Sequence, residues 1–507
     1  MFARLARNIA ISGVAFGVIG VIGLALAPIL IAAYGFAGYG QILLARMVLP
    51  SGTLGVLEFG TSETATRIVA TAREDQNWRH ASGTLGFLGA LVLVVIVPVA
   101  LALAIFASDL TQLLSIPKEQ AEGFSQILVI TSFLLPFLFF SLIFEGVLKG
   151  FEDFKRQRSC EVSSSIIFAI LAVVLVIYDF GANWIAGALL VGLSVRFVMA
   201  AYFALNALRK VNAPVSAWTK NQRNLVLEWS QIMLVNKLIG SVQGQSVLPL
   251  LGFIFGPVAV GAFDAVARLP RFVKSVFGLL NVVLLPMATG LYARNDSLGV
   301  QRLGQIGILT VMMLTWPTLG VMMAGSAPIL EIWLGNQVAA NWGWQALLFI
   351  VPMLTVVWSF GANIILAQRR GAMQSNRIVA IQVVIQLALS FLMLRWLNEW
   401  AFALGLAASS VLLFPLQMRL LAKWLGFDRR FYGAMARQAM IIGIMCVPTL
   451  LIATNNSRPE LAIAVAVLTL PFIWLASYFG VLSPEQREAF SDMVRRRWSM
   501  LGSTGVS

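Results

Sequence analysis

Cysteine, histidine and nucleotide-binding motifs are scarce or absent in this sequence. It has two cysteines, Cys160 and Cys446, and one histidine, His80. The cysteines lie far apart and the histidine stands alone, so these residue types do not predict a zinc site, a haem site or a redox pair. The P-loop pattern GxxxxGK[ST] does not occur either. The sequence therefore predicts no metal and no cofactor.

Charge is also scarce. Only 11% of the 507 residues are charged and 59% are hydrophobic, whereas soluble proteins carry about 25% charged residues. Apolar runs long enough to cross about 30 Å of hydrocarbon as a helix recur along the whole chain. We therefore predict an all-α polytopic membrane protein. Its fourteen membrane helices are expected at residues 9–33, 41–70, 81–106, 123–148, 159–178, 184–208, 227–255, 258–292, 303–324, 344–366, 378–396, 401–421, 434–453 and 461–481.

The cations are unevenly distributed between the two sides of this predicted bundle. Lys and Arg total 36 and Asp and Glu total 22, which gives a net charge of +14. Most cations lie in segments that follow every second helix, whereas the other loops hold Lys118, Arg395 and Arg458. Because cytoplasmic loops are enriched in Lys and Arg, both termini are expected in the cytoplasm. Topology thus accounts for the positive charge, and no nucleic-acid partner is predicted.

Three pairs of landmark segments recur at a nearly constant offset, which suggests an internal repeat of six helices. The pairs are 65–75 with 288–296, 108–117 with 327–336, and 148–158 with 366–377. Two halves related in this way would enclose a central substrate cavity, although chance similarity of apolar helices is an alternative. The expected organisation is an N-lobe at 1–212, a C-lobe at 213–432, two extra helices at 433–482 and a cytoplasmic tail at 483–507.

Six cations lie inside the predicted membrane helices. Each costs at least about 2.5 kcal/mol at mid-membrane, so acids, water or an anionic substrate must offset on the order of 15 kcal/mol. The six are Arg46, Arg196, Lys237, Arg268, Arg271 and Lys274. The candidate acids, which could also couple transport to an ion, are Asp264, Glu58 and Glu63, with Glu145, Glu161 and Glu228 nearer the cytoplasmic surface. The excess of cations predicts a cationic cavity that binds an anionic substrate.

The segment FDAVARLPRFVKSVFG at 263–278 concentrates these charges. On a helix, Asp264, Arg268 and Arg271 share one face with Lys274 at its edge, and the opposite face is apolar. Asp264 and Arg268 stand four residues apart and could pair. Two other interpretations remain open: a shorter helix at 275–293 that leaves 263–274 at the outer interface, and a purely structural network of ion pairs.

The segments LEFGTSETATRIVATARE (57–74), LKGFEDFKRQR (148–158) and GPVAVGAFDAVARLPRFVKSVFGLLNVVLLPMATGLYAR (256–294) resemble the O-antigen and exopolysaccharide flippases. These belong to the multidrug/oligosaccharidyl-lipid/polysaccharide exporter superfamily. The resemblance implies a multi-pass protein of the bacterial inner membrane that moves undecaprenyl-diphosphate-linked oligosaccharide to the outer leaflet. Related lipid flippases keep cavity arginines in helices 1, 2 and 8. Arg46 and Arg268 match helices 2 and 8, but helix 1 carries no charge here.

Three function classes remain at this point. A flippase explains the excess of cations, because a diphosphate suits bidentate arginine contacts. A multidrug or cation antiporter of the same superfamily should present acids and aromatic rings to its substrates. A membrane polysaccharide polymerase or ligase would need a sizeable outer loop, and the predicted outer loops are short. We therefore expect a transporter and not an enzyme. Its expected partners are the bilayer and a lipid-linked sugar, and a polymerase or chain-length regulator is a candidate partner.

Overall fold

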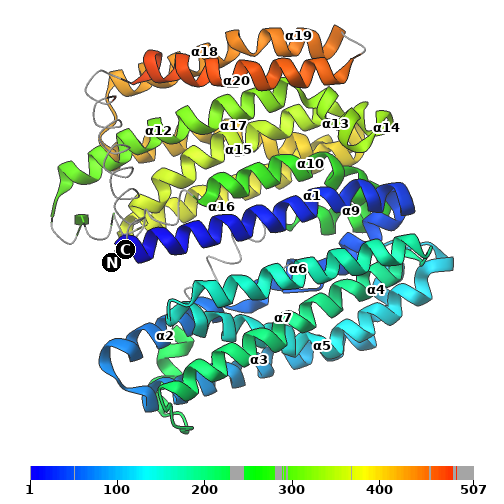
Figure 1. Cartoon of the computed structure of the whole chain (residues 1–507), viewed down its shortest axis with the longest axis vertical. Coiled ribbons are helices and arrows are strands. Elements are labelled where there is room, and N and C mark those ends of the chain that lie inside the picture. The colour runs from blue at the N-terminus through cyan, green and yellow to red at the C-terminus, as the bar shows by residue number, and fades with distance from the viewer. Residues whose placement is uncertain are drawn as a thin grey trace, which may run out of the picture. The chain divides into compact units, whose positions relative to one another are not determined.

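The computed structural model describes residues 2–50, 52–228, 245–279, 288, 291–292, 295–366, 368–455, 458–482 and 487. Within these ranges every regular element is a helix (Figure 1). Ten helical stretches of the described chain are long and apolar enough to cross a membrane. Each of the fourteen predicted ranges contains helix in its described part. The protein is therefore an all-α, multi-pass membrane protein.

The chain divides into two compact units, Met1–Ala265 and Val266–Ser507. The predicted lobe boundary lies earlier, at 212/213, and the six-helix repeat stays a prediction. In unit 1, α5 packs against α2, α3 and α7, and α6 packs against α1 and α7. The elements of unit 1 are α1 (Phe2–Met47), η1 (Thr53–Glu58), α2 (Thr61–Asp75), α3 (Trp78–Ile105), α4 (Ala107–Leu113), α5 (Lys118–Gly150), α6 (Phe154–Ile177), α7 (Ala182–Lys210), α9 (Val247–Phe255) and the start of α10 (Pro257–Gly278).

The second predicted span, 41–70, is wrong as a single helix. The first predicted span, 9–33, continues without a loop into residues 41–47, and both are parts of α1. This helix changes direction at Gly35, where φ is 62°. The chain then leaves the helix after Met47, forms the short 3-10 helix η1, and turns through Phe59 and Gly60 at positive φ before α2 begins. Gly35 suits its position because a residue without Cβ adopts positive φ at little cost.

Two glycines allow α5 to lie close to α2. A Cβ on Gly146 would collide with the carbonyl oxygen of Ser62, and a Cβ on Gly150 would lie 2.8 Å from that of Thr66. The Thr66 hydroxyl also donates to the Gly146 carbonyl at 3.1 Å. Small residues four apart permit this kind of backbone approach between membrane helices. The crossing fixes the position of Glu145, the neighbour of Gly146.

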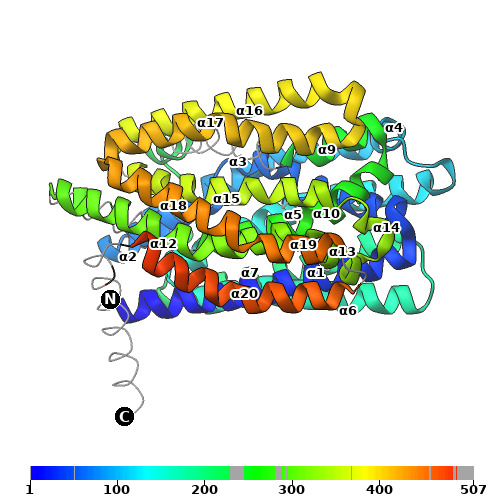
Figure 2. The same cartoon turned by 90° about the horizontal axis from the view of Figure 1, so that it is seen from above.

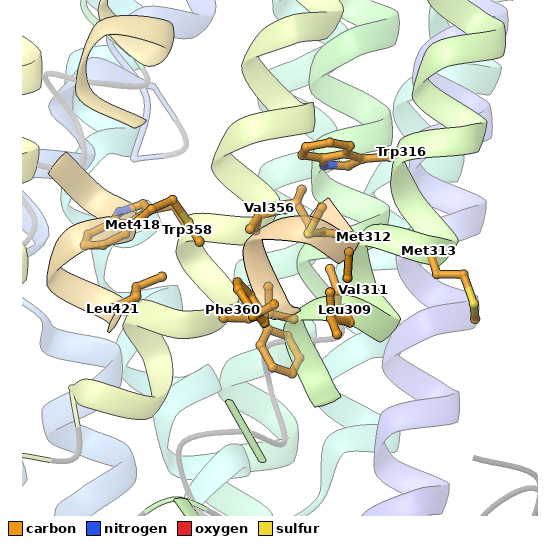
Figure 3. Close-up of a cluster of buried hydrophobic side chains, with 14 of the residues drawn as sticks. Leu309, Val311, Met312, Met313, Trp316, Val356, Trp358, Phe360, Met418 and Leu421 are labelled. Atoms are coloured by element: carbon orange, nitrogen blue, oxygen red, sulfur yellow. The ribbon is translucent and has the colours of Figure 1, made fainter. Parts of the chain in front are cut away.

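Unit 2 is built around α12, α15 and α17, whose apolar side chains interlock in a buried cluster that includes Trp316, Val356, Phe360 and Leu421 (Figure 3). The Trp316 indole N–H donates to the Met353 carbonyl at 2.8 Å, so its one polar atom is satisfied inside the core. Beyond α10, the elements are α12 (Ser297–Ala324), α13 (Ser326–Leu334), α14 (Asn336–Ala339), α15 (Trp342–Ile365), α16 (Arg369–Leu397), η3 (Asn398–Trp400), α17 (Ala401–Leu425), α18 (Arg429–Met445), α19 (Val447–Asn455) and α20 (Pro459–Val481).

Short connections in both units end in helix caps. Four helices begin after an Asn or Asp whose side chain accepts a hydrogen bond from a backbone N–H three residues later, which satisfies a donor that the helix leaves unpaired. The capping residues are Asn77 for α3, Asp153 for α6, Asp296 for α12 and Asp428 for α18.

In unit 2, α16 and α17 run alongside each other as a hairpin (Figure 2).

Candidate functional site

The polar face of α10 carries the largest group of predicted site residues. The helix continues through Pro270 and holds Asp264, Arg268, Arg271 and Lys274 within its 22 residues. Because α10 carries these four charges, it is not among the ten stretches of the described chain that are apolar enough to cross a membrane. Arg271 and Lys274 are exposed and Arg268 is half-buried.

The opposite face of α10 packs as its sequence predicts. Val266 and Val273 are buried, and Phe277 packs against the core cluster of unit 2. The segment 263–274 is thus continuous helix with one packed side and one accessible cationic side. A shorter helix that begins only at residue 275 is therefore wrong.

Asp264 lies in a close crossing between α10 and the second part of α1. A Cβ on Gly40 would collide with the Pro257 carbonyl, and a Cβ on Gly261 would collide with the Phe36 carbonyl. This proximity lets the Tyr39 hydroxyl donate to a carboxylate oxygen of Asp264 at 2.6 Å. The two residues are only 1% and 3% exposed. The structure thus gives Asp264 a buried hydroxyl donor, and its predicted pairing with Arg268 stays a prediction.

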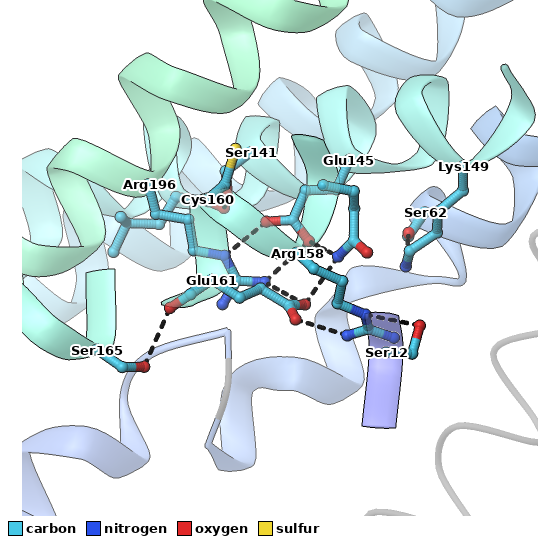
Figure 4. Close-up of polar contacts among 12 residues, drawn as sticks. Ser12, Ser62, Ser141, Glu145, Lys149, Arg158, Cys160, Glu161, Ser165 and Arg196 are labelled. Carbon is cyan, nitrogen blue, oxygen red and sulfur yellow. Dashed lines mark hydrogen bonds and ion pairs between the residues drawn. The ribbon is translucent and has the colours of Figure 1, made fainter. Parts of the chain in front are cut away.

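Arg196 of α7 lies in a separate cluster of charges in unit 1 (Figure 4). Its Nε donates to Oε1 of Glu145 at 2.5 Å and its Nη2 donates to Oε2 at 2.8 Å, so the pair is bidentate. Nη2 also lies 3.4 Å from Glu161 of α6. The Glu145 side chain is 2% exposed and that of Arg196 is 22% exposed. The burial of Glu145 requires such pairing, because an unpaired carboxylate here would lose its hydration.

Glu161 extends this cluster to α1. Arg158 donates to its Oε2 at 2.5 Å and to the Ser12 hydroxyl at 3.3 Å, and Gln157 donates to its Oε1 at 2.8 Å. The two arginines and two glutamates sum to zero charge. The cluster, which we call the Glu145–Arg196 network, therefore links α1, α5, α6 and α7 through charge-balanced ion pairs.

The remaining predicted residues have varied surroundings. Arg46 is exposed in the last turn of α1, Glu58 is buried in η1, and Glu63 is exposed in the first turn of α2. Lys237 lies outside the described residues. In the part of the chain that the structure describes, no three His, Cys, Asp or Glu side chains come together in a way that could hold a metal ion.

Sequence analysis does not identify several partners in these clusters, among them Tyr39 and Arg158. Tyr39 stands between Gly38 and Gly40, and glycines on both sides of an aromatic residue indicate a close helix approach. The predicted helices leave Arg158 in a cytoplasmic loop, although Arg158 and Glu161 have the i, i+3 spacing of a helical ion pair. The glycines beside Tyr39 indicate a helix contact but do not indicate that its partner is Asp264. The spacing of Arg158 and Glu161 indicates both partners of that ion pair.

The family model described as "Polysaccharide biosynthesis protein" matches residues 5–291, which is more than half of the chain. The chain belongs to this polysaccharide biosynthesis family. The matched region contains α10 and the whole Glu145–Arg196 network, and it ends before α12. No curated protein matches the sequence.

Solved structures of membrane transporters share the fold of this family member. One is titled "Lipid II flippase MurJ, inward closed conformation"; it is 13% identical, with a TM-score of 0.71 over 93% of this chain and 99% of that chain. An inward-facing multidrug resistance MATE family transporter of the MOP superfamily is 14% identical, with a TM-score of 0.61 over 81% and 96%. A MOP superfamily transporter from Pyrococcus furiosus, whose title reports a reversed polarity of its binding pocket, is 14% identical, with a TM-score of 0.56 over 83% and 97%. At these identities the likeness establishes the fold.

Proposed function

We propose that this protein is a flippase that moves undecaprenyl-diphosphate-linked oligosaccharide from the cytoplasmic to the outer leaflet of the bacterial inner membrane by alternating access. The observation that carries the proposal is the accessible cationic face of α10 in a member of a polysaccharide biosynthesis family. The fold shared with a lipid II flippase supports it.

The chemistry of the proposed substrate fits this face. A diphosphate presents several anionic oxygens, which the planar guanidinium groups of Arg268 and Arg271 suit in bidentate fashion. Lys274 would add a point charge at the edge of the same face. Arg46 and Lys237 are further proposed ligands, and Asp264, Glu58 and Glu63 are the proposed ion-coupling acids. For Arg196 a substrate contact would have to use N–H groups other than the Nε and Nη2 donors that Glu145 holds.

The proposal is tested by glycan export in cells that depend on this protein. In the double variant Arg268→Gln/Arg271→Gln, export should fall by at least about tenfold, since charged hydrogen bonds of this kind contribute about 1.5–3 kcal/mol each. The double Arg→Lys variant should keep part of the activity because charge survives without the bidentate fork. Protein level in the membrane must be measured in parallel.

Arg419→Gln is the matched control for this experiment, because Arg419 is an exposed arginine on another membrane helix, α17. It should leave export unchanged. Wild-type export in the Arg268→Gln/Arg271→Gln variant would refute a cationic binding face. Intact export together with lost resistance to organic cations would instead favour the antiporter alternative.

A further inference from the structure

A cavity of about 620 Å³ lies in unit 2, between the start of α12, the start of α18 and the end of α20. Its wall is unusually rich in arginine. Its charged residues are Arg302, Arg430, Arg437, Arg487 and Asp428, and Phe479 also lines it. Four guanidinium groups against one carboxylate leave an excess of three positive charges.

The local contacts neutralise little of this charge within the described residues. Arg487 is held in place, since its Nε donates to the Leu482 carbonyl at 3.0 Å and its guanidinium lies 5.4 Å from the centre of the Phe479 ring. Asp428 accepts the capping hydrogen bond from the Phe431 N–H at 2.8 Å. Among the residues that the structure describes, no acid forms an ion pair with Arg302, Arg430 or Arg437. The cavity is therefore suited to an anion.

Apolar helix faces lead away from the same cavity. On α20, exposed Leu475, Phe472 and Leu468 continue the helical face of Phe479. On α18, exposed Met440 and Ile444 follow Arg437 on one face in the same way. The α20 stripe from 479 to 468 covers about 16 Å at 1.5 Å per residue, close to half of a hydrocarbon core about 30 Å thick. That length suits a lipid chain confined to one leaflet.

We propose that this cavity binds the phosphate headgroup of an anionic glycerophospholipid, with an acyl chain along the exposed faces of α18 and α20. Basic pockets between membrane helices recognise anionic headgroups in this way, and planar guanidinium groups match phosphate geometry. The topology predicted from the sequence places these helix ends at the cytoplasmic leaflet. The site lies beyond the residues matched by the family model and is independent of the proposed flippase activity.

The test uses the delipidated full-length protein in detergent, titrated with phosphatidylglycerol or with phosphatidylcholine of the same acyl chains, and native mass spectrometry counts the bound lipid. Wild-type protein should bind phosphatidylglycerol saturably and about tenfold or more tightly than phosphatidylcholine. Both headgroups carry a phosphate, but the choline cation of phosphatidylcholine is repelled by the excess positive charge of the cavity. Equal binding of the two lipids would overturn the proposal without any variant.

The variant arm is Arg430→Gln/Arg437→Gln, which should abolish this preference. The control Lys423→Gln/Arg429→Gln removes two charges from the adjoining ends of α17 and α18, at residues that do not line the cavity, and should keep it. Equal loss in both double variants would show that binding follows total charge and would overturn the proposal. Two competitors identify other occupants: displacement of phosphatidylglycerol by equimolar undecaprenyl diphosphate would assign the cavity to the substrate, and displacement by inorganic pyrophosphate would assign it to a soluble anion.

Discussion

Cationic side chains within the predicted membrane helices have two kinds of surroundings in this protein. Arg196 donates both sides of its guanidinium to the buried carboxylate of Glu145, whereas Arg271 and Lys274 are exposed on α10. The sequence indicates that each of these charges needs compensation, because the cost depends on residue type and depth. It does not indicate the partner, because Glu145 and Arg196 are 51 residues apart and meet only when α5 packs on α7.

The Glu145–Arg196 pair should behave as a coupled unit in a double-mutant cycle. Glu145→Gln leaves the partly buried guanidinium of Arg196 with a weakened partner, so we expect a loss of about 3–5 kcal/mol in the free energy of unfolding. The double variant Glu145→Gln/Arg196→Gln should recover much of that loss, because neither charge remains. Thermal unfolding of the four proteins in detergent measures the coupling, and additive losses would contradict it.

Glycan export by the same double variant decides the role of Arg196. A purely structural pair predicts that export returns together with stability. If the double variant is stable but inactive, Arg196 is a substrate ligand, as its position in the sequence predicts.

At the scale of elements, the apolar runs correctly predict helix in the described part of every span, but the connection predicted between the first two spans is wrong. Pro50, Gly52 and Gly60 are visible helix breakers within 41–70, and the structure ends α1 and begins α2 around them. The single helix predicted at 41–70 rests on the hydrophobic content of this segment and disregards these helix breakers. The break at Gly35 is harder to predict, because glycine is common in membrane helices and its conformation depends on tertiary contacts.

The α2–α5 crossing depends on the absence of a side chain at Gly146. Gly146→Ala should lower the free energy of unfolding by about 1–3 kcal/mol, since the new methyl group meets the backbone at Ser62 and the helices must move apart. The control is Gly187→Ala on α7, where a Cβ would meet no atom within 4 Å. Melting temperatures in detergent should fall for the first variant and stay level or rise for the second. Equal shifts would show that the crossing is not tightly packed.

The whole molecule has a predicted orientation, with both termini in the cytoplasm. Single cysteines can test it, because native Cys160 and Cys446 are both buried and should react slowly. Gln76→Cys and Asn212→Cys, at exposed sites, should resist a membrane-impermeant maleimide in intact spheroplasts. Glu119→Cys and Gln337→Cys, also exposed, should be labelled there. Reversal at any one position would contradict the predicted topology.

The energy source of the proposed transport follows from the sign of the substrate. The cell interior is negative, and each charge that crosses gains or loses about 2.3 kcal/mol per 100 mV. Outward movement of a doubly anionic diphosphate, followed by return of the empty cationic face of α10, would therefore run downhill in potential. A drive of this kind needs no nucleotide-binding site, which agrees with the absence of a P-loop pattern from the sequence. An ion moving inward on Asp264, Glu58 or Glu63 would add to it.

We therefore predict electrogenic transport. In proteoliposomes that contain a lipid-linked sugar, an imposed potential should accelerate flipping when it draws negative charge in the direction of transport and slow it when reversed. Asp264→Asn separates the two possible drives, because it removes the acid that Tyr39 contacts while keeping an acceptor for the Tyr39 hydroxyl. If the potential alone drives transport, the variant should keep its response to voltage. A rate that follows a pH or sodium gradient but ignores voltage would refute the potential-driven mechanism and indicate electroneutral exchange through the acids.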